Sequence, residues 1–112
     1  MEIQIVKEPI KKSVLEEIAK DQFVDLVKVV VDIEQEIMAI GGEMHADEEV
    51  ELISKYGSLR ENTWGINLWI KRDNMIEYDS MINLKANKNR TRNIESPEVR
   101  EKIVQTVSKL IK

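Results

Sequence analysis

The residues best suited to chemistry follow a pair of glycines, where Glu43, His45 and Asp47 alternate along the chain. In an extended backbone they would project to the same side. A carboxylate beside an imidazole is a typical acid–base pair, because histidine titrates near neutral pH and a carboxylate can orient its ring. Glu43 and His45 could also contribute to a divalent metal site. The metal is the less favoured interpretation, since the other ligands would have to come from elsewhere.

The same segment has a structural explanation. Asp47 precedes the acidic segment 48–53, so it could be a helix N-cap with acids placed favourably in the first turn. This helix would run to about Lys55 and end near Gly57. A lone histidine in a turn is also usually a surface residue.

A second hairpin is expected from residues 63–71 and 75–84, which both alternate in polarity. We predict a turn at Arg72-Asp73-Asn74 with Asn74 in a left-handed conformation. This register buries one apolar face, which includes Trp64, Ile66 and Leu68. It also pairs Ile70 with Ile76, Leu68 with Tyr78, Ile66 with Ser80 and Trp64 with Ile82.

The opposite face of this hairpin is polar. The register places Asn67 opposite Asp79 and Trp69 opposite Glu77, with Gly65 leaving space beside them. A few polar groups next to an aromatic ring are typical of the floor of a small pocket. The alternative is an ordinary solvated face, which antiparallel sheets commonly have.

A loop rich in basic residues and asparagine follows, over residues 85–95. Arginine binds carboxylates and phosphates through two parallel hydrogen bonds, so Arg90 or Arg92 could hold an anion. No aromatic residue in the loop offers a platform for base stacking, which argues against nucleic acid as a partner. Its basic residues are Lys85, Lys88, Arg90 and Arg92, and they are interleaved with Asn87, Asn89 and Asn93, with Asn83 just before the loop.

These groups lead to a functional hypothesis. We expect Glu43, His45 and Asp79 to surround a common cleft, reached by Arg90 or Arg92, that binds or acts on a small polar or anionic ligand. Further ligand contacts would come from Asn67, Trp69 and Asn83. The alternative is an interaction module without catalysis: a homodimer joined through an open sheet edge or the Trp69 face, or a contact of the 85–93 loop with an acidic partner or nucleic acid. Only the first hypothesis requires the polar groups to converge on one concavity.

Positioning these residues requires a sheet covered by helices. A short strand at Glu2–Lys7 is followed by a helix from Lys11 or Ser13 to about Gln22. The most apolar part of the chain, residues 27–41, is expected to be a central hairpin with Glu34-Gln35-Glu36 as its loop. That loop pairs Ile33 with Ile37, Val31 with Ala39 and Val29 with Gly41.

The chain closes with a helix that begins at an N-cap, Ser96, followed by Pro97 at the first helical position. Its buried residues are expected to be Val99, Ile103, Val107 and Leu110, with Ile111 beside them. The resulting order is β-α-β-β-α-β-β-α. This order predicts a single α+β domain over residues 1–112, with a mixed or mainly antiparallel sheet of about five strands and helices packed on a face.

Composition narrows the classes of protein. The 112-residue chain has no cysteine, which excludes disulfides, thiolate metal sites and a cysteine nucleophile. No apolar run approaches the roughly 20 residues that span a bilayer, so we expect no membrane partner and a cytoplasmic location. The net charge of −4 argues against non-specific binding to nucleic acid over the whole surface.

Several segments also resemble a known family. The strings V-V-D-I-E, A-I-G-G-E-M-H-A-D-E-E, T-W-G-I-N, S-M-I-N and N-R-T-R occur in this order over nearly the full chain. They resemble a family of small prokaryotic proteins catalogued only as a domain of unknown function. The resemblance implies a cytoplasmic prokaryotic protein and supplies no activity, cofactor or partner.

Overall fold

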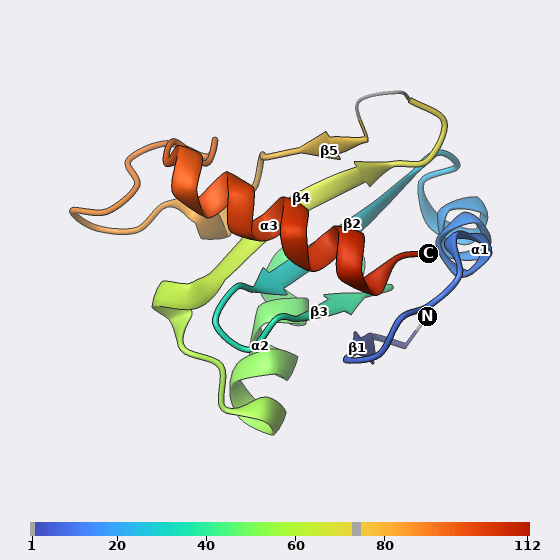
Figure 1. The fold of residues 1–112 in the computed structure, drawn as a ribbon, viewed down its shortest axis with the longest axis horizontal. Coiled ribbons are helices and arrows are strands. Elements are labelled where there is room, and N and C mark those ends of the chain that lie inside the picture. The colour runs from blue at the N-terminus through green and yellow to red at the C-terminus, as the bar shows by residue number, and fades with distance from the viewer. Residues whose placement is uncertain (1, 73–74) are drawn as a thin grey trace.

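The fold is organised around an antiparallel sheet in which the strands lie in the order β1-β3-β2-β4-β5 (Figure 1). The structure is a computed structural model that describes residues 2–72 and 75–112. Its elements confirm the predicted order of an α+β fold. They are β1 (Gln4–Val6), α1 (Lys12–Gln22), β2 (Leu26–Asp32), β3 (Ile37–Ile40), α2 (His45–Tyr56), the 3-10 helix η1 (Arg60–Asn62), β4 (Thr63–Trp69), β5 (Ile76–Glu77), the 3-10 helix η2 (Met81–Asn83) and α3 (Pro97–Leu110).

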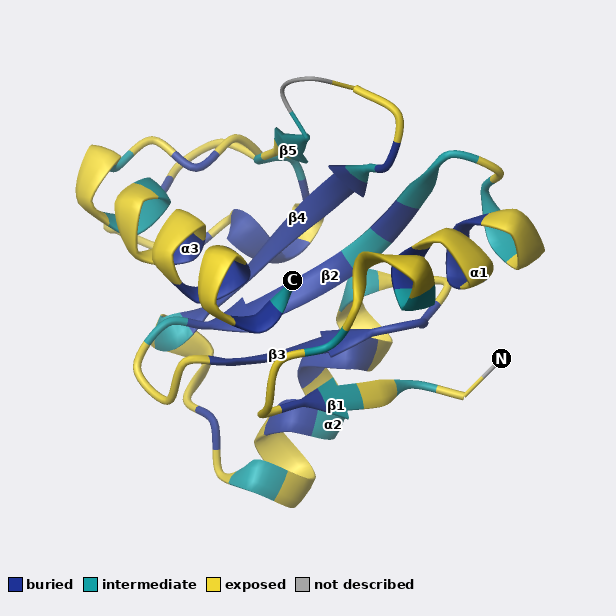
Figure 2. Cartoon of the chain, turned by 45° about the vertical axis from the view of Figure 1, so that its right-hand side comes forward, coloured by how far each residue is buried: buried dark blue, intermediate teal, exposed yellow. Residues whose placement is uncertain are grey.

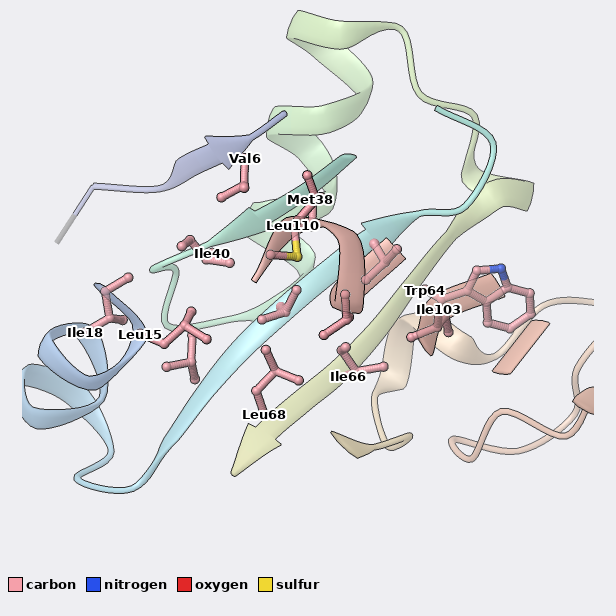
Figure 3. Packing of buried hydrophobic residues seen from close by; sticks show 14 of the residues in the cluster. Val6, Leu15, Ile18, Met38, Ile40, Trp64, Ile66, Leu68, Ile103 and Leu110 are labelled. Carbon is pink, nitrogen blue, oxygen red and sulfur yellow. The ribbon is translucent and has the colours of Figure 1, made fainter. Parts of the chain in front are cut away.

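Helices cover both faces of this sheet. Helices α1 and α3 pack on one face, where the odd-numbered valines of β2 meet Leu15, Ile103 and Leu110 (Figure 3). Helix α2 and η2 pack on the other face, where Leu52 and Ile82 contact a smaller cluster around Val30. Because both faces are covered, β2 and β4 are buried over most of their length (Figure 2).

The closing helix follows its local sequence signals. Ser96 Oγ accepts a hydrogen bond from the backbone N–H of Val99 at 3.2 Å, and Pro97 occupies the first turn, where a missing N–H costs nothing. Ile103, Val107 and Leu110 are buried against the sheet, as predicted.

The predicted register of the central hairpin is wrong by one residue. Val31 pairs with Met38 rather than with Ala39, so the loop has four residues, Ile33 to Glu36. The turn is stabilised by Asp32, whose Oδ1 accepts hydrogen bonds from the N–H groups of Glu34 and Gln35 at 2.9 and 3.1 Å. Glu36 adopts a positive φ of 56°, which completes the longer loop. Met38 therefore lies on the face of Val31, and Ala39 on the face of Val30.

The second hairpin keeps its predicted faces as far as Asp79, but its register is shifted by two residues. Asn67 pairs with Glu77 rather than with Asp79. A shift of two leaves each side chain on its own face. Leu68 is therefore buried beneath α1 and α3, whereas Asp79 lies on the opposite face. The predicted turn at Arg72-Asp73-Asn74, with its left-handed Asn74, includes residues 73–74, which lie outside the described residues.

The strand predicted over residues 75–84 is reduced to β5. After Ser80 the chain enters η2, where Ser80 Oγ accepts a hydrogen bond from the N–H of Ile82 at 3.3 Å. Ile82 consequently does not pair with Trp64, nor Ser80 with Ile66. Both residues lie on the face that α2 covers, so their prediction on the face of Trp64 and Ile66 is wrong. A side chain from η2, Asn83, supplies β4 with the hydrogen bonds that a longer strand would have made.

Candidate functional site

A cleft of about 190 Å³ lies at the start of α2, on the face of the sheet that α2 covers. Its polar residues come from four places in the sequence: Lys28 on β2, Asn67 on β4, His45 on α2, and Asp79, Ser80 and Arg92 from the segment after β5. Its apolar wall includes Met44, Ala46, Met81 and Ile82. Three of the residues that we predicted to meet in one concavity, His45, Asp79 and Arg92, therefore line the same cleft.

His45 is the first residue of α2 and contacts the sheet directly. Its Nε2 lies 2.8 Å from the carbonyl oxygen of Ile66. A carbonyl can only accept, so Nε2 carries the proton. Burial lowers the pKa of His45 below its ordinary value of 6.5. The cations of Lys28 and Arg92 also lower it, and the Ile66 bond and Asp79 act the other way. The neutral ring therefore leaves Nδ1 as an acceptor.

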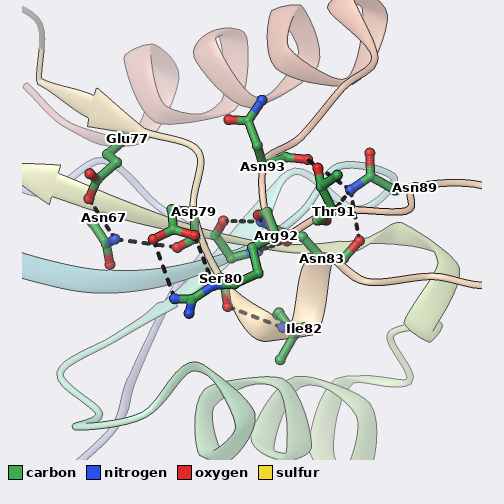
Figure 4. A network of polar contacts seen from close by, with 11 residues as sticks. Asn67, Glu77, Asp79, Ser80, Ile82, Asn83, Asn89, Thr91, Arg92 and Asn93 are labelled. Atoms are coloured by element: carbon green, nitrogen blue, oxygen red, sulfur yellow. Dashed lines mark hydrogen bonds and ion pairs between the residues drawn. The ribbon is translucent and has the colours of Figure 1, made fainter.

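Asn67 forms the floor of the cleft, directly opposite Lys28 in the β2–β4 ladder. Its Nδ2 donates to Glu77 Oε1 at 2.9 Å and to the carbonyl oxygen of Asp79 at 3.3 Å (Figure 4). Both partners are acceptors, which determines the orientation of the amide. Its Oδ1 is buried and has no hydrogen-bond donor in the part of the chain that the structure describes.

Asp79 and Arg92 form an ion pair at the cleft. Arg92 donates from Nε to Asp79 Oδ1 at 3.0 Å and from Nη2 to Oδ2 at 3.3 Å. Both side chains are about half exposed, so water screens the pair and it adds little to folding stability. An arrangement of this kind leaves the guanidinium free to exchange partners at low cost.

The segment after β5 is held by two buried asparagines. Asn83 accepts from the N–H of Gly65 at 2.8 Å and donates to the carbonyl oxygens of Gly65 and Arg92 at 2.9 and 3.0 Å. Asn89 Nδ2 lies 2.9 Å from each of three carbonyl oxygens, including that of Asn83 (Figure 4). Asn83, which we had predicted as a ligand contact, does not line the cleft; its amide instead positions the wall that carries Arg92.

Other predicted site residues lie away from the cleft. Glu43 is exposed in the turn before α2, and Arg90 borders a separate hollow formed by residues 84–90. Trp69 lies near the end of β4, where Nε1 donates to Glu77 at 3.2 Å and the Arg72 guanidinium stacks 3.7 Å from the ring centroid.

The predicted alternation of Glu43, His45 and Asp47 is interrupted by the helix. The N-cap of α2 is Met44, so the prediction that Asp47 is the cap is wrong, and Asp47 lies inside the first turn. Successive helical residues point in different directions, and the three side chains therefore do not share a side. The predicted end is confirmed, because Gly57 closes α2 with a φ of 68°.

Sequence reasoning missed Lys28. The signal was a single lysine inside the apolar strand L-V-K-V-V-V, at a position that faces the covered side of the sheet.

Lys85 and Lys88, which belong to the basic loop predicted to bind an anion, instead contact an aromatic ring of the chain. Their Nζ atoms lie 4.8 and 5.8 Å from the centroid of the buried Trp64 ring. Burial lowers the pKa of Lys85 to about 8, and its Nζ donates to the carbonyl oxygen of Arg60 at 2.6 Å.

Within residues 2–72 and 75–112, no group of three or more His, Cys, Asp or Glu side chains is arranged to hold a metal ion. In the same residues, no helix is long and apolar enough to cross a membrane.

Comparison with known proteins identifies a family. A family model described as "Protein of unknown function (DUF5674)" matches residues 4–110, which is nearly the whole chain. No curated protein and no solved structure matches the sequence.

Proposed function

We propose that this chain, which belongs to the DUF5674 family of proteins of unknown function, binds a small anion in the cleft at the start of α2. The observation that carries the proposal is Lys28, whose ammonium group makes no ion pair with any described carboxylate although it lines the cleft. A cation in a partly closed cleft is stabilised by an anion that enters it. Phe23, 5.3 Å from Lys28 Nζ, is its aromatic neighbour.

The charges around the cleft favour an anion over a cation. Lys28 and Arg92 are positive, and Asp79 alone among the lining residues is negative. His45 is neutral, because burial and the two cations lower its pKa. Asp79 already pairs with Arg92, so its carboxylate is not free to bind a cation. An anion would therefore contact Lys28 and share the Arg92 guanidinium with Asp79.

The size of the cleft limits the ligand. Pockets for drug-sized molecules have volumes of about 300–1,000 Å³, and this cleft has about 190 Å³. A carboxylate with a few carbon atoms, or inorganic phosphate, suits this volume. If the bound molecule reacts, His45 is the residue placed to accept or return a proton, since its Nδ1 is unprotonated.

The basic loop gives the interaction module less support than the cleft gives the anion site. Lys85 and Lys88 pack over Trp64, and Arg92 pairs with Asp79, so three of the four basic side chains are engaged within the chain. A cytoplasmic location in a prokaryotic cell and a homodimer are further proposals, which rest on the sequence resemblance and on the open edges of the sheet. Failure of the anion test would favour the interaction module.

The test is a titration of the isotope-labelled protein with acetate and with inorganic phosphate, followed by amide chemical shifts. We expect saturable shifts at His45 and Ala46, and at least tenfold weaker binding for Lys28→Met. Lys12→Met is the matched control, because it removes the same charge from the exposed start of α1 and should bind like the wild type. Equal affinities of Lys28→Met and the wild type, or shifts confined to other surfaces, would refute the proposal.

A further inference from the structure

We infer that the ligand of this cleft carries a hydroxyl group beside its anionic group, as an α-hydroxy carboxylate does. The inference rests on the proposed anion site and adds the chemistry next to it. Two acceptor atoms of cleft residues, Asn67 Oδ1 and His45 Nδ1, have no donor among the described residues. Acceptors without a partner select for a ligand that donates hydrogen bonds.

The buried Oδ1 of Asn67 is the stronger of the two observations. The residue is only 9% exposed, and a buried acceptor normally has a partner. Other described residues also have such atoms, namely Gln22 Oε1, Glu48 Oε1 and Trp64 Nε1, but of these residues only Asn67 lines the cleft. Its Nδ2 is committed to Glu77 and Asp79, so the amide cannot rotate to present a donor to the cleft. Only an incoming donor can satisfy the oxygen.

His45 adds a second acceptor in the same cleft. The bond from Nε2 to the Ile66 carbonyl holds the ring in one tautomer, with the lone pair on Nδ1. The ring lies at the first residue of α2 and is packed against β4, so it presents this nitrogen from a rigid element. The cleft therefore combines an anion-binding lysine with two neutral acceptors.

A hydroxyl matches this combination better than the alternatives. A bare carboxylate has only acceptor atoms, so it would leave both protein acceptors unsatisfied. An ammonium group donates, but it would bring a positive charge close to Lys28 and Arg92. A hydroxyl donates one hydrogen bond without adding charge, so it can satisfy one of the two acceptors.

Access to Asn67 involves Lys28. The two residues are direct neighbours across the β2–β4 ladder, and Asn67 Oδ1 is closed to solvent. The lysine side chain is long and flexible. An anion bound in the cleft would attract the Lys28 ammonium group, and we expect the resulting movement of the side chain to expose Asn67 Oδ1 to the hydroxyl.

The experiment compares glycolate with acetate and glycine, which have nearly the same size, by the same amide-shift titration. We expect glycolate to bind at least about tenfold more tightly than acetate, a difference of about 1.4 kcal/mol, and glycine to bind most weakly. The inference is overturned if acetate binds as tightly as glycolate, or if glycine binds best. If none of the three binds, the anion site itself is wrong and the inference falls with it.

Two variants assign the effect to the acceptors. Because one hydroxyl donates one hydrogen bond, either Asn67→Leu or His45→Phe should bring the affinities for glycolate and acetate together while keeping acetate binding, and Lys28→Met should weaken both ligands. His45→Phe retains an aromatic ring at the start of α2, so it reports on Nδ1 even if Asn67→Leu does not fold. An unchanged preference for glycolate in one folded variant would assign the hydroxyl to the other acceptor, and an unchanged preference in both would overturn the inference.

Discussion

Asn83 offers a sharp test of how the wall of the cleft is built. The residue is fully buried, and its amide occupies the place of a missing strand beside Gly65. We consider Asn83→Leu, which keeps a side chain of similar volume and removes both polar atoms. The substitution leaves the N–H and the carbonyl oxygen of Gly65 without their side-chain partner. The Arg92 carbonyl is less affected, because it also accepts from the N–H of Ser80 at 3.1 Å.

The expected magnitude follows from these two groups. A buried polar group that loses its partner costs about 1–3 kcal/mol, so Asn83→Leu should lower the free energy of unfolding by roughly 2–6 kcal/mol. This is a large part of the ~5–15 kcal/mol that typical domains have. The measurement is urea unfolding followed by tryptophan fluorescence, since Trp64 is 1% exposed in the folded chain.

The matched control is Asn93→Leu. Asn93 is exposed, and its Oδ1 accepts from Arg100 Nη2 at 3.0 Å, so its loss should cost less than about 1 kcal/mol. If Asn83→Leu and Asn93→Leu have the same midpoint as the wild type at an unchanged slope, the Asn83 amide does not hold this segment.

Three other predictions concern stability. Val107→Ala should lower the free energy of unfolding by about 1–3 kcal/mol, because Val107 is 5% exposed and packs on the sheet; an unchanged urea midpoint would contradict this packing. Val24 has a φ of 72° and is 70% exposed, so Val24→Asn should raise stability by about 1 kcal/mol, measured by urea unfolding, through relief of backbone strain at little cost in burial; a lower midpoint would contradict the strain. Burial raises the pKa of Glu48 well above its ordinary value of 4.5. The folded state therefore binds the extra proton, and stability present below about pH 4.5 is lost as pH rises through the folded-state pKa. Glu48→Gln should remove this loss. The measurement is the free energy of unfolding between about pH 5 and 8, and the same dependence on pH in both proteins would refute the prediction.

The positions and types of most elements are determined by the sequence itself. The N-cap at Ser96, the proline after it and the spacing of Ile103, Val107 and Leu110 are local signals, and each acts within one or two helical turns. Gly57 ends α2 for an equally local reason, because glycine adopts a positive φ without steric cost. The α+β class follows from the order of such elements.

The registers and the membership of the cleft depend on tertiary structure. Asp32 accepts two hydrogen bonds from its own loop, and these bonds, together with the positive φ of Glu36, make the loop four residues long. Alternating polarity specifies which side chains share a face, but a register shift of two residues leaves that pattern unchanged. Polarity therefore could not distinguish the observed pairing of Asn67 with Glu77 from the predicted one with Asp79.

The cleft illustrates the same limit. Lys28 joins it because β2 lies beside β4, so Lys28 and Asn67 are direct neighbours although they are far apart in the sequence. Glu43 is excluded because α2 begins at His45 and ends the extended backbone that would have aligned the two side chains. Residue types and spacing indicated His45, Asp79 and Arg92 as groups that could act together. Their actual neighbours were decided by strand order and helix start, which depend on contacts between segments distant in the sequence.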